Sequence, residues 1–183
     1  ATIMLGLISE VPISNKLTSQ LIVLADSTLS AAASTITFDV EGVRYPMLWF
    51  KAYTFQDTSS GRAYIRLNAD TGSNYNFTMS RWDNTITGTS RSTSQTFMDT
   101  AYTDAGTGSD EGQALDGIIA KPAAASRGTM YLRSTLFKGG EPAIYRSSGE
   151  WTNTANHITK VTFYPSAGNF DAGSYFQIYG VEV

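Results

Sequence analysis

The C-terminal stretch ITKVTFYPSAGNFDAGSYFQIYGVEV, residues Ile158–Val183, carries the clearest structural pattern in the chain. Two runs within it, Ile158–Tyr164 and Tyr175–Val183, alternate with a period of two. Phe176 and Ile178 fall on the same side of the second run, as expected for a strand with one buried face. A terminal strand is held only when it is paired, so we predict that the chain closes with a hairpin inside a sheet.

The connector between these runs, PSAGNFDAGS, has the composition of a turn-rich segment. Pro165 lacks a backbone N–H for the sheet ladder and is expected to end the first strand. Gly168 and Gly173 are suited to the positive φ that turns require. Phe170 is expected to anchor the connector against the sheet.

The composition favours a single all-β domain with an added arm. The chain has 183 residues, 12% aromatic side chains, 16 glycines and no cysteine, and it lacks long helical repeats. Without cysteine, disulfides and thiolate metal sites are excluded. The net charge of −3 without a basic cluster argues against a nucleic-acid partner. No apolar run approaches the roughly 20 residues that insert into a membrane, and the start has no signal-peptide pattern.

Period-two alternation continues through most of the chain. Met47–Phe55 has bulky side chains on both faces and is predicted to be a central strand covered on both sides. It is expected to form a hairpin with Ala63–Asn68. Further strands are predicted at Gln20–Asp26, Thr35–Val40, Tyr75–Trp82, Gln95–Tyr102, Leu115–Ala120, Thr129–Lys138 and Pro142–Ser148, with a hairpin turn at Gly139-Gly140.

These signals predict an antiparallel β-sandwich of jelly-roll type with about ten strands. The sandwich domain is expected to span 20–183, with 83–117 as a long polar loop insertion. Its predicted core consists of Phe38, Phe50, Ile65, Leu67, Leu132, Leu136, Val161, Phe163, Phe176 and Ile178.

Residues 1–19 form the predicted N-terminal extended arm. The arm is too apolar for a solvated tail, so it is expected to pack on its own domain or to dock on a neighbouring subunit or a capsid. The candidate subunit or capsid contacts are Ile3, Met4, Leu5, Leu7, Ile8, Val11 and Ile13.

The sequence provides weak candidates for catalysis and metal binding. His157 is the only histidine, and no nucleophile elbow accompanies it, so a surface histidine is the favoured interpretation. The spacing Asn68, Asp70, Gly72 and Asn74 has one carboxylate, which favours an Asx-rich turn over a calcium loop. We therefore predict no catalytic, metal or cofactor-binding residues and no enzymatic activity.

Acidic residues and aromatic residues leave two further possibilities open. A pair of carboxylates can cleave a glycosidic bond, but nothing in the pattern brings two of the loop's acidic residues into one cleft. Aromatic side chains outside the core could stack on sugars or lie at an interface. The acidic residues are Asp104, Asp110, Glu111 and Asp116, and the aromatic ones are Trp82, Trp151, Tyr64 and Tyr145.

Several segments together resemble a broad group of tailed-phage virion proteins, which includes head-decoration and tail-fibre proteins with β-sandwich folds. The resemblance covers segments spread over Ser30–Val183 and leaves out 1–29 and much of 83–117. It is carried by SAAASTITF at Ser30–Phe38, the step at Val40–Leu48, RLNADTGSNY at Arg66–Tyr75, and the closing ITKV, PSAGNF, GS and YGV motifs.

This resemblance implies a virion structural protein that is assembled in the host cytoplasm. A capsid decoration or cement protein that binds and stabilises the assembled head is the favoured interpretation. The alternative is the glycan-binding, receptor-binding module of a tail fibre or spike; a polysaccharide hydrolase is less favoured. The implied partners are further copies in a homotrimer, the major capsid protein or other virion proteins, and a host surface glycan.

Overall fold

The computed structural model describes residues 21–57, 62–82, 87–100, 112–138 and 141–182. All regular elements within these ranges are strands. They are β1 (Leu21–Thr28), β2 (Ile36–Asp39), β3 (Met47–Thr54), β4 (Ala63–Leu67), β5 (Tyr75–Trp82), β6 (Thr87–Gln95), β7 (Met98–Asp99), β8 (Gln113–Ala120), β9 (Gly128–Lys138), β10 (Glu141–Trp151), β11 (Lys160–Pro165) and β12 (Tyr175–Val181).

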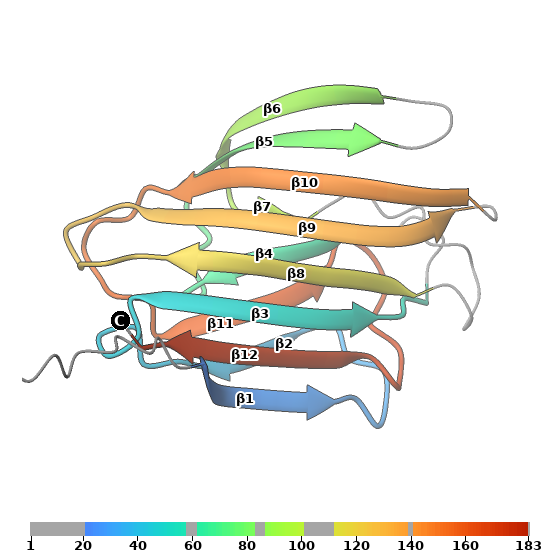
Figure 1. Ribbon diagram of the computed structural model, residues 1–183, viewed down its shortest axis with the longest axis horizontal. Helices are drawn as coiled ribbons and strands as arrows, with labels where there is room; N and C mark the ends of the chain where they lie inside the picture. The colour runs from blue at the N-terminus through green and yellow to red at the C-terminus, as the bar shows by residue number, and fades with distance from the viewer. Residues whose placement is uncertain (1–20, 58–61, 83–86, 101–111, 139–140, 183) are drawn as a thin grey trace, which may run out of the picture.

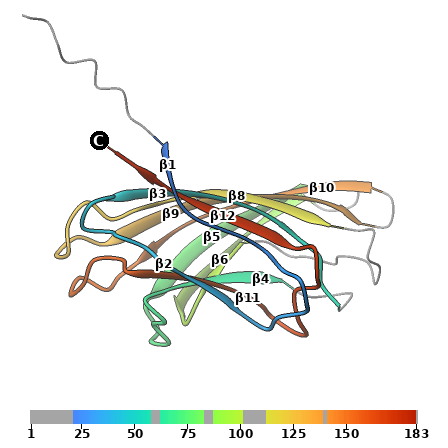
Figure 2. The same ribbon diagram turned by 90° about the horizontal axis from the view of Figure 1, so that it is seen from below.

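The strands form two antiparallel sheets, as in a β-sandwich. The larger sheet has eight strands in the order β1-β12-β3-β8-β9-β10-β5-β6, and the smaller has four in the order β2-β11-β4-β7. Figure 1 looks onto the long strands of the larger sheet, and Figure 2 shows β2, β11 and β4 lying beneath them. The predicted all-β class is confirmed by this arrangement.

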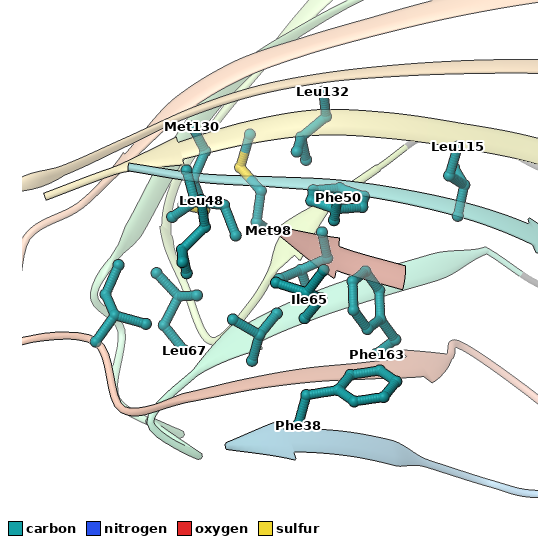
Figure 3. Close-up of a cluster of buried hydrophobic side chains, with 14 of the residues drawn as sticks. Phe38, Leu48, Phe50, Ile65, Leu67, Met98, Leu115, Met130, Leu132 and Phe163 are labelled. Carbon is teal, nitrogen blue, oxygen red and sulfur yellow. The ribbon is translucent and has the colours of Figure 1, made fainter. Parts of the chain in front are cut away.

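The main core lies between the two sheets and contains nine of the ten residues that the alternation assigned to it. Leu48, Phe50 and Leu132 point from the larger sheet toward Ile65 and Phe163 of the smaller one (Figure 3). The ten predicted core side chains are all at most 7% exposed. Leu136 lies apart from the main cluster, with Ala143 and Tyr145.

The closing segment is the first point at which the structure differs from the sequence prediction. β11 and β12 do not form a hairpin, because β11 pairs with β2 and β4 whereas β12 pairs with β1 and β3. The connector is bonded to other parts of the chain: Phe170 exchanges backbone hydrogen bonds with Ala33, at 2.9 Å each. These bonds hold the connector in place where the chain passes from the smaller sheet to the larger one.

Other predictions for this connector are confirmed. Phe170 is fully buried, and its ring centroid lies 5.2 Å from that of Phe176. Gly168 and Gly173 have φ of 65° and 88°, in the left-handed region that glycine tolerates best. The terminal strand β12 is paired on both sides.

The interpretation of the aromatic strand β3 was wrong in two respects. It forms no hairpin with β4, because the two strands belong to different sheets. It is also covered on one side only: Leu48, Phe50 and Ala52 are buried, whereas Lys51 and Tyr53 are exposed. The smaller sheet can cover only one face of the larger sheet, so the other face stays open.

The stretch 83–117 was predicted as a long polar loop but contains β6, β7 and most of β8. β6 has the polar sequence TGTSRSTSQ and pairs antiparallel with β5 at the edge of the larger sheet. Backbone hydrogen bonds do not depend on apolar side chains, and polar side chains suit an exposed edge strand. A prediction based on apolar alternation therefore missed this strand.

β9 and β10 pair along their full length, from Glu141↔Lys138 to Trp151↔Gly128, which confirms the predicted hairpin. Two aromatic residues that were placed outside the core are fully buried, namely Tyr145 and Trp151. The apolar arm 1–19 lies outside the described residues.

Candidate binding face

The open face of the eight-stranded sheet is the strongest candidate for a functional surface. Successive strand residues point to opposite faces, so the burial of Phe50 on β3 places its neighbours Trp49 and Lys51 on the other side. We call this uncovered side the outer face. It presents many large side chains although no other described element covers it.

Strand register arranges the outer face in rows that cross the sheet. One row is polar and charged, and it contains Asp26, Gln177, Lys51, Asp116, Arg133 and Arg146. The rows on either side are rich in aromatic and aliphatic side chains. The first of these contains Tyr175, Tyr53, Ala114, Thr135, Ile144 and Trp82, and the second contains Val23, Tyr179, Trp49, Ile118 and Tyr131.

An apolar patch lies at the end of the outer face where β1 begins. We call it the apolar corner and define it by Leu21, Val23, Met47, Ile118 and Tyr131. The exposed fractions of Leu21 and Val23 are 51% and 53%, and those of Ile118 and Tyr131 are 41% and 44%. Tyr179 and Trp49 lie between Val23 and Ile118 in the same row, and a gathering of exposed apolar side chains is typical of an interaction site.

A groove of about 460 Å³ runs over the neighbouring part of the face. Aromatic walls are provided by Trp49, Tyr53 and Tyr175, and polar groups by Lys51, Asp116, Arg133 and Thr135. The volume lies within the range of about 300–1,000 Å³ that small-ligand sites occupy. The groove therefore combines apolar rings with a few charged groups, which is the composition of a recognition site.

Side-chain contacts hold one wall of the groove in place. The rings of Trp49 and Tyr179 stack across the β3–β12 pair with centroids 5.1 Å apart and planes 23° apart. The Tyr179 hydroxyl hydrogen-bonds the Gln177 side chain, and the Lys51 ammonium lies 5.6 Å from the centroid of the Tyr179 ring. A hydrogen bond with Tyr179 raises the pKa of Lys51.

The charged row has a positive balance within an acidic protein. Arg133 donates from Nε to the Asp116 carboxylate at 2.8 Å, which leaves Lys51 and Arg146 as further cations of the row. The Arg146 guanidinium lies 5.4 Å from the Trp82 ring centroid. Among the described residues, Lys51 has no ion-pair partner within 4.0 Å.

The described lining of the groove contains a single carboxylate. Asp116 is the only carboxylate among its described lining residues, and no histidine lies there. Glycoside cleavage requires two carboxyl groups that flank the bond. Asp116 was one of the four acidic candidates, and the other three, Asp104, Asp110 and Glu111, lie outside the described residues.

The remaining sequence candidates are placed elsewhere. Asp70 accepts hydrogen bonds from Gly72 N at 2.8 Å and Asn74 Nδ2 at 2.9 Å, which is the geometry of an Asx-rich turn. His157 is half-buried, and its carbonyl oxygen accepts from Asn68 at 2.7 Å. Of the four aromatic candidates, Trp82 is exposed on the outer face, and Tyr64 stacks on Phe97 in the smaller sheet.

Sequence reasoning did not identify the groove. The aromatic run Met47–Phe55 contained its main signal, since Trp49, Lys51 and Tyr53 share one parity. Their opposite face carries Phe50, and the mixture of bulk on both sides led to the wrong prediction of a strand covered twice. Strand pairing alone brings the distant residues Asp116, Arg133 and Tyr175 into the site.

Searches for other site types within the described ranges were negative. No group of three or more His, Asp or Glu side chains there is placed to hold a metal ion. No helix in these ranges has the length and apolar character to cross a membrane. Comparison of the chain with protein-family models, curated proteins and solved structures gave no match.

Proposed function

We propose that this protein is a non-catalytic structural protein of a phage virion, which decorates the assembled head and stabilises it. The apolar corner is the observation that carries the proposal, since four of its five side chains are more than 40% exposed. The sequence resemblance to virion proteins supports the head shell or another virion protein as the partner.

The physical argument is one of surface burial. Completely burying a large aliphatic side chain contributes about 1.5–3 kcal/mol, so covering a half-exposed one contributes about half of that. Tyr and Arg are enriched at interface hot spots; Tyr131 belongs to the corner, and Arg133 lies on the same face of β9 two residues further on. A shell surface with an apolar depression would match this patch.

The proposal includes assembly as a homotrimer. A protein without cysteine can gain stability by burying apolar surface between subunits, and closed cyclic symmetry suits a fixture at a threefold point of a shell. The sequence 1–19 ends two residues before Leu21, so its apolar residues are proposed as further contacts with a neighbouring subunit or the shell.

Binding to heads assembled from the phage's own major capsid protein tests the proposal. The wild-type chain should cosediment with these heads. Ile118→Asp and Tyr131→Asp should each bind at least about tenfold more weakly, because each introduces a charge into an apolar contact. Thr35→Asp, at an exposed site away from the outer face, is the matched control and should bind like wild type.

Circular dichroism and thermal unfolding of each variant separate loss of binding from loss of fold. Light scattering should give a mass of three chains, 3 × 19.8 = 59.4 kDa. Corner variants that decorate heads as well as wild type would overturn the proposed contact, and a wild-type chain that does not bind heads would overturn the proposed function.

A second candidate function, receptor binding by a tail fibre or spike, is supported by the groove. Its aromatic walls and charged floor are suited to a glycan, and the groove variants Lys51→Gln and Tyr53→Ala should not affect head binding. Head binding and glycan binding can therefore be measured separately.

A further inference from the structure

We propose that the groove between β12, β3, β8 and β9 binds an acidic saccharide. This proposal concerns a ligand class and a site that head decoration does not require. It rests on three features of the groove: partly exposed aromatic rings, cationic side chains and an ordered wall.

The aromatic rings provide an apolar platform for sugar rings. Tyr53 is 43% exposed, and Trp49 and Tyr175 are half-buried beside it along the groove. The faces of Trp and Tyr rings offer large rigid apolar surface while their polar ends remain hydrated. The C–H face of a pyranose can pack on such rings, and its hydroxyls remain free to meet the neighbouring polar row.

The cationic row selects for a negative charge on that saccharide. Within the groove, two cations, Lys51 and Arg133, face one carboxylate, Asp116, although the whole chain has a net charge of −3. The same row continues outside the groove to Arg146 on β10 and to Asp26 on β1. Guanidinium groups recognise carboxylates with strong charge-assisted hydrogen bonds. A uronic acid offers a carboxylate on the edge of a sugar ring, so it can use the rings and the cations together.

Contacts that are already formed in the free protein reduce the conformational entropy that is lost when a ligand binds. Trp49 is stacked on Tyr179, Tyr179 is hydrogen-bonded to Gln177, and Arg133 is paired with Asp116. A site that holds its contact groups before the ligand arrives loses less conformational freedom on binding. Asp116 also limits the positive charge, which makes the row less attractive to polyanions without sugar rings.

Gly112 adds a local observation about Tyr53. A Cβ atom at Gly112 would lie 2.4 Å from the Tyr53 ring, so the ring packs directly on this glycine backbone. Gly112→Ala should therefore displace the Tyr53 ring while every side chain that would contact the ligand keeps its chemical identity.

An array of uronate-containing oligosaccharides, printed beside the same oligosaccharides with their carboxyl groups reduced to alcohols, tests the proposal. The wild-type chain should bind acidic members and bind their reduced counterparts at least about tenfold more weakly, because the reduced forms lose the charge-assisted contacts. Raising the salt concentration should weaken binding to the acidic members, because the cations lie at the surface.

Titration calorimetry with the best acidic oligosaccharide then assigns the site. Lys51→Gln and Tyr53→Ala should each weaken binding at least about tenfold, and Gly112→Ala should weaken it as well. Ile144→Ala is the matched control, because Ile144 lies on the same face but does not line the groove, and it should bind like wild type. In a Trp82→Phe background, ligand should change the fluorescence of Trp49, since Trp151 is buried.

Three results would overturn the proposal. The first is that the protein binds no acidic saccharide on the array. The second is that it binds the carboxyl-reduced forms as tightly as the acidic ones. The third is equal affinity for inorganic polyphosphate, which would indicate simple attraction of polyanions. Lys51 is exposed, so Lys51→Gln should fold normally. It therefore tests the site even if Tyr53→Ala does not fold. Head binding by Ile118→Asp is a separate measurement, so failure here leaves head decoration standing.

Discussion

The indole N–H of Trp151 donates a 2.7 Å hydrogen bond to the carboxylate of Asp70, 81 residues earlier in the chain. Asp70 lies in the turn between β4 of the smaller sheet and β5 of the larger one, and Trp151 is the last residue of β10. Trp151 is fully buried, and a buried tryptophan N–H needs an acceptor. This bond fixes the turn that carries the chain between the two sheets.

Replacement of Asp70 should destabilise the fold. Asp70→Ala leaves the Trp151 N–H without its acceptor and removes the bonds from Gly72 and Asn74, so the free energy of unfolding should fall by about 1–3 kcal/mol. Urea denaturation at neutral pH measures this. Thr71→Ala, at an exposed position in the same turn, should change stability by less than about 0.5 kcal/mol. Equal effects of the two substitutions would contradict the proposed role of Asp70.

Acid should remove the same contribution in the wild-type protein. Burial alone would raise the pKa of Asp70, but hydrogen bonds from Trp151, Asn74 and Gly72 together lower it below the ordinary 3.8. The contribution is therefore complete above the unfolded pKa and is lost as the pH falls through the lower folded pKa. The stability difference between wild type and Asp70→Asn should shrink between pH 7 and pH 2, as followed by urea denaturation. A difference that stays constant over this range would contradict the prediction.

The buried Lys121 should stabilise the segment that follows β8. Its ammonium donates to the carbonyl oxygens of Ala124, Ser126 and Asn153 and lies 5.4 Å from the Trp151 ring centroid. Lys121→Met should lower the free energy of unfolding by at least about 2 kcal/mol, because three carbonyls lose their donor. Thermal and urea unfolding measure the loss.

A surface lysine provides the control for that substitution. Lys160 lies 3.7 Å from the Asp39 carboxylate, and about half of its side chain is exposed. Exposed ion pairs contribute about 0–1 kcal/mol, so Lys160→Met should be nearly neutral. A loss for Lys160→Met as large as that for Lys121→Met would show that burial of Lys121 is not the cause.

Loss of the Phe170 ring should loosen the connection between the sheets. Phe170 is fully buried against Phe176, and Phe→Ala substitutions in cores cost about 3–5 kcal/mol. Phe170→Ala should therefore reduce the denaturation midpoint strongly, and hydrogen exchange should increase at Ala33. Ala172→Ser, exposed in the same connector, should leave both unchanged.

Two glycines in strands should respond in opposite ways to the same change. A Cβ at Gly117 would lie 2.6 Å from side-chain atoms of Leu132 and Phe50, whereas one at Gly88 meets nothing within 4 Å. Gly117→Ala should cost about 1–3 kcal/mol through overpacking, and Gly88→Ala should be neutral or slightly stabilising. Equal stability of the two variants in a denaturant titration would refute this account.

Local properties of the chain were predictable because they depend on neighbouring residues. The period-two alternation of Val161, Phe163, Phe176 and Ile178 determined which side of each strand is buried. The turn glycines Gly168 and Gly173 were recognisable because few other residues tolerate positive φ. The all-β class and the ten predicted core positions followed from these same short-range patterns.

The tertiary structure decided which sheet each strand joins and which face remains open. β11 and β12 alternate in the same way, and only the long-range bonds of the connector, such as Phe170 with Ala33, assign them to different sheets. The polar strand β6 forms through backbone pairing, which leaves no apolar signal in the sequence. The groove depends on the same kind of information: strand register brings Lys51, Asp116 and Arg133 into one row, and register is a relation between segments that the alternation within each segment does not contain.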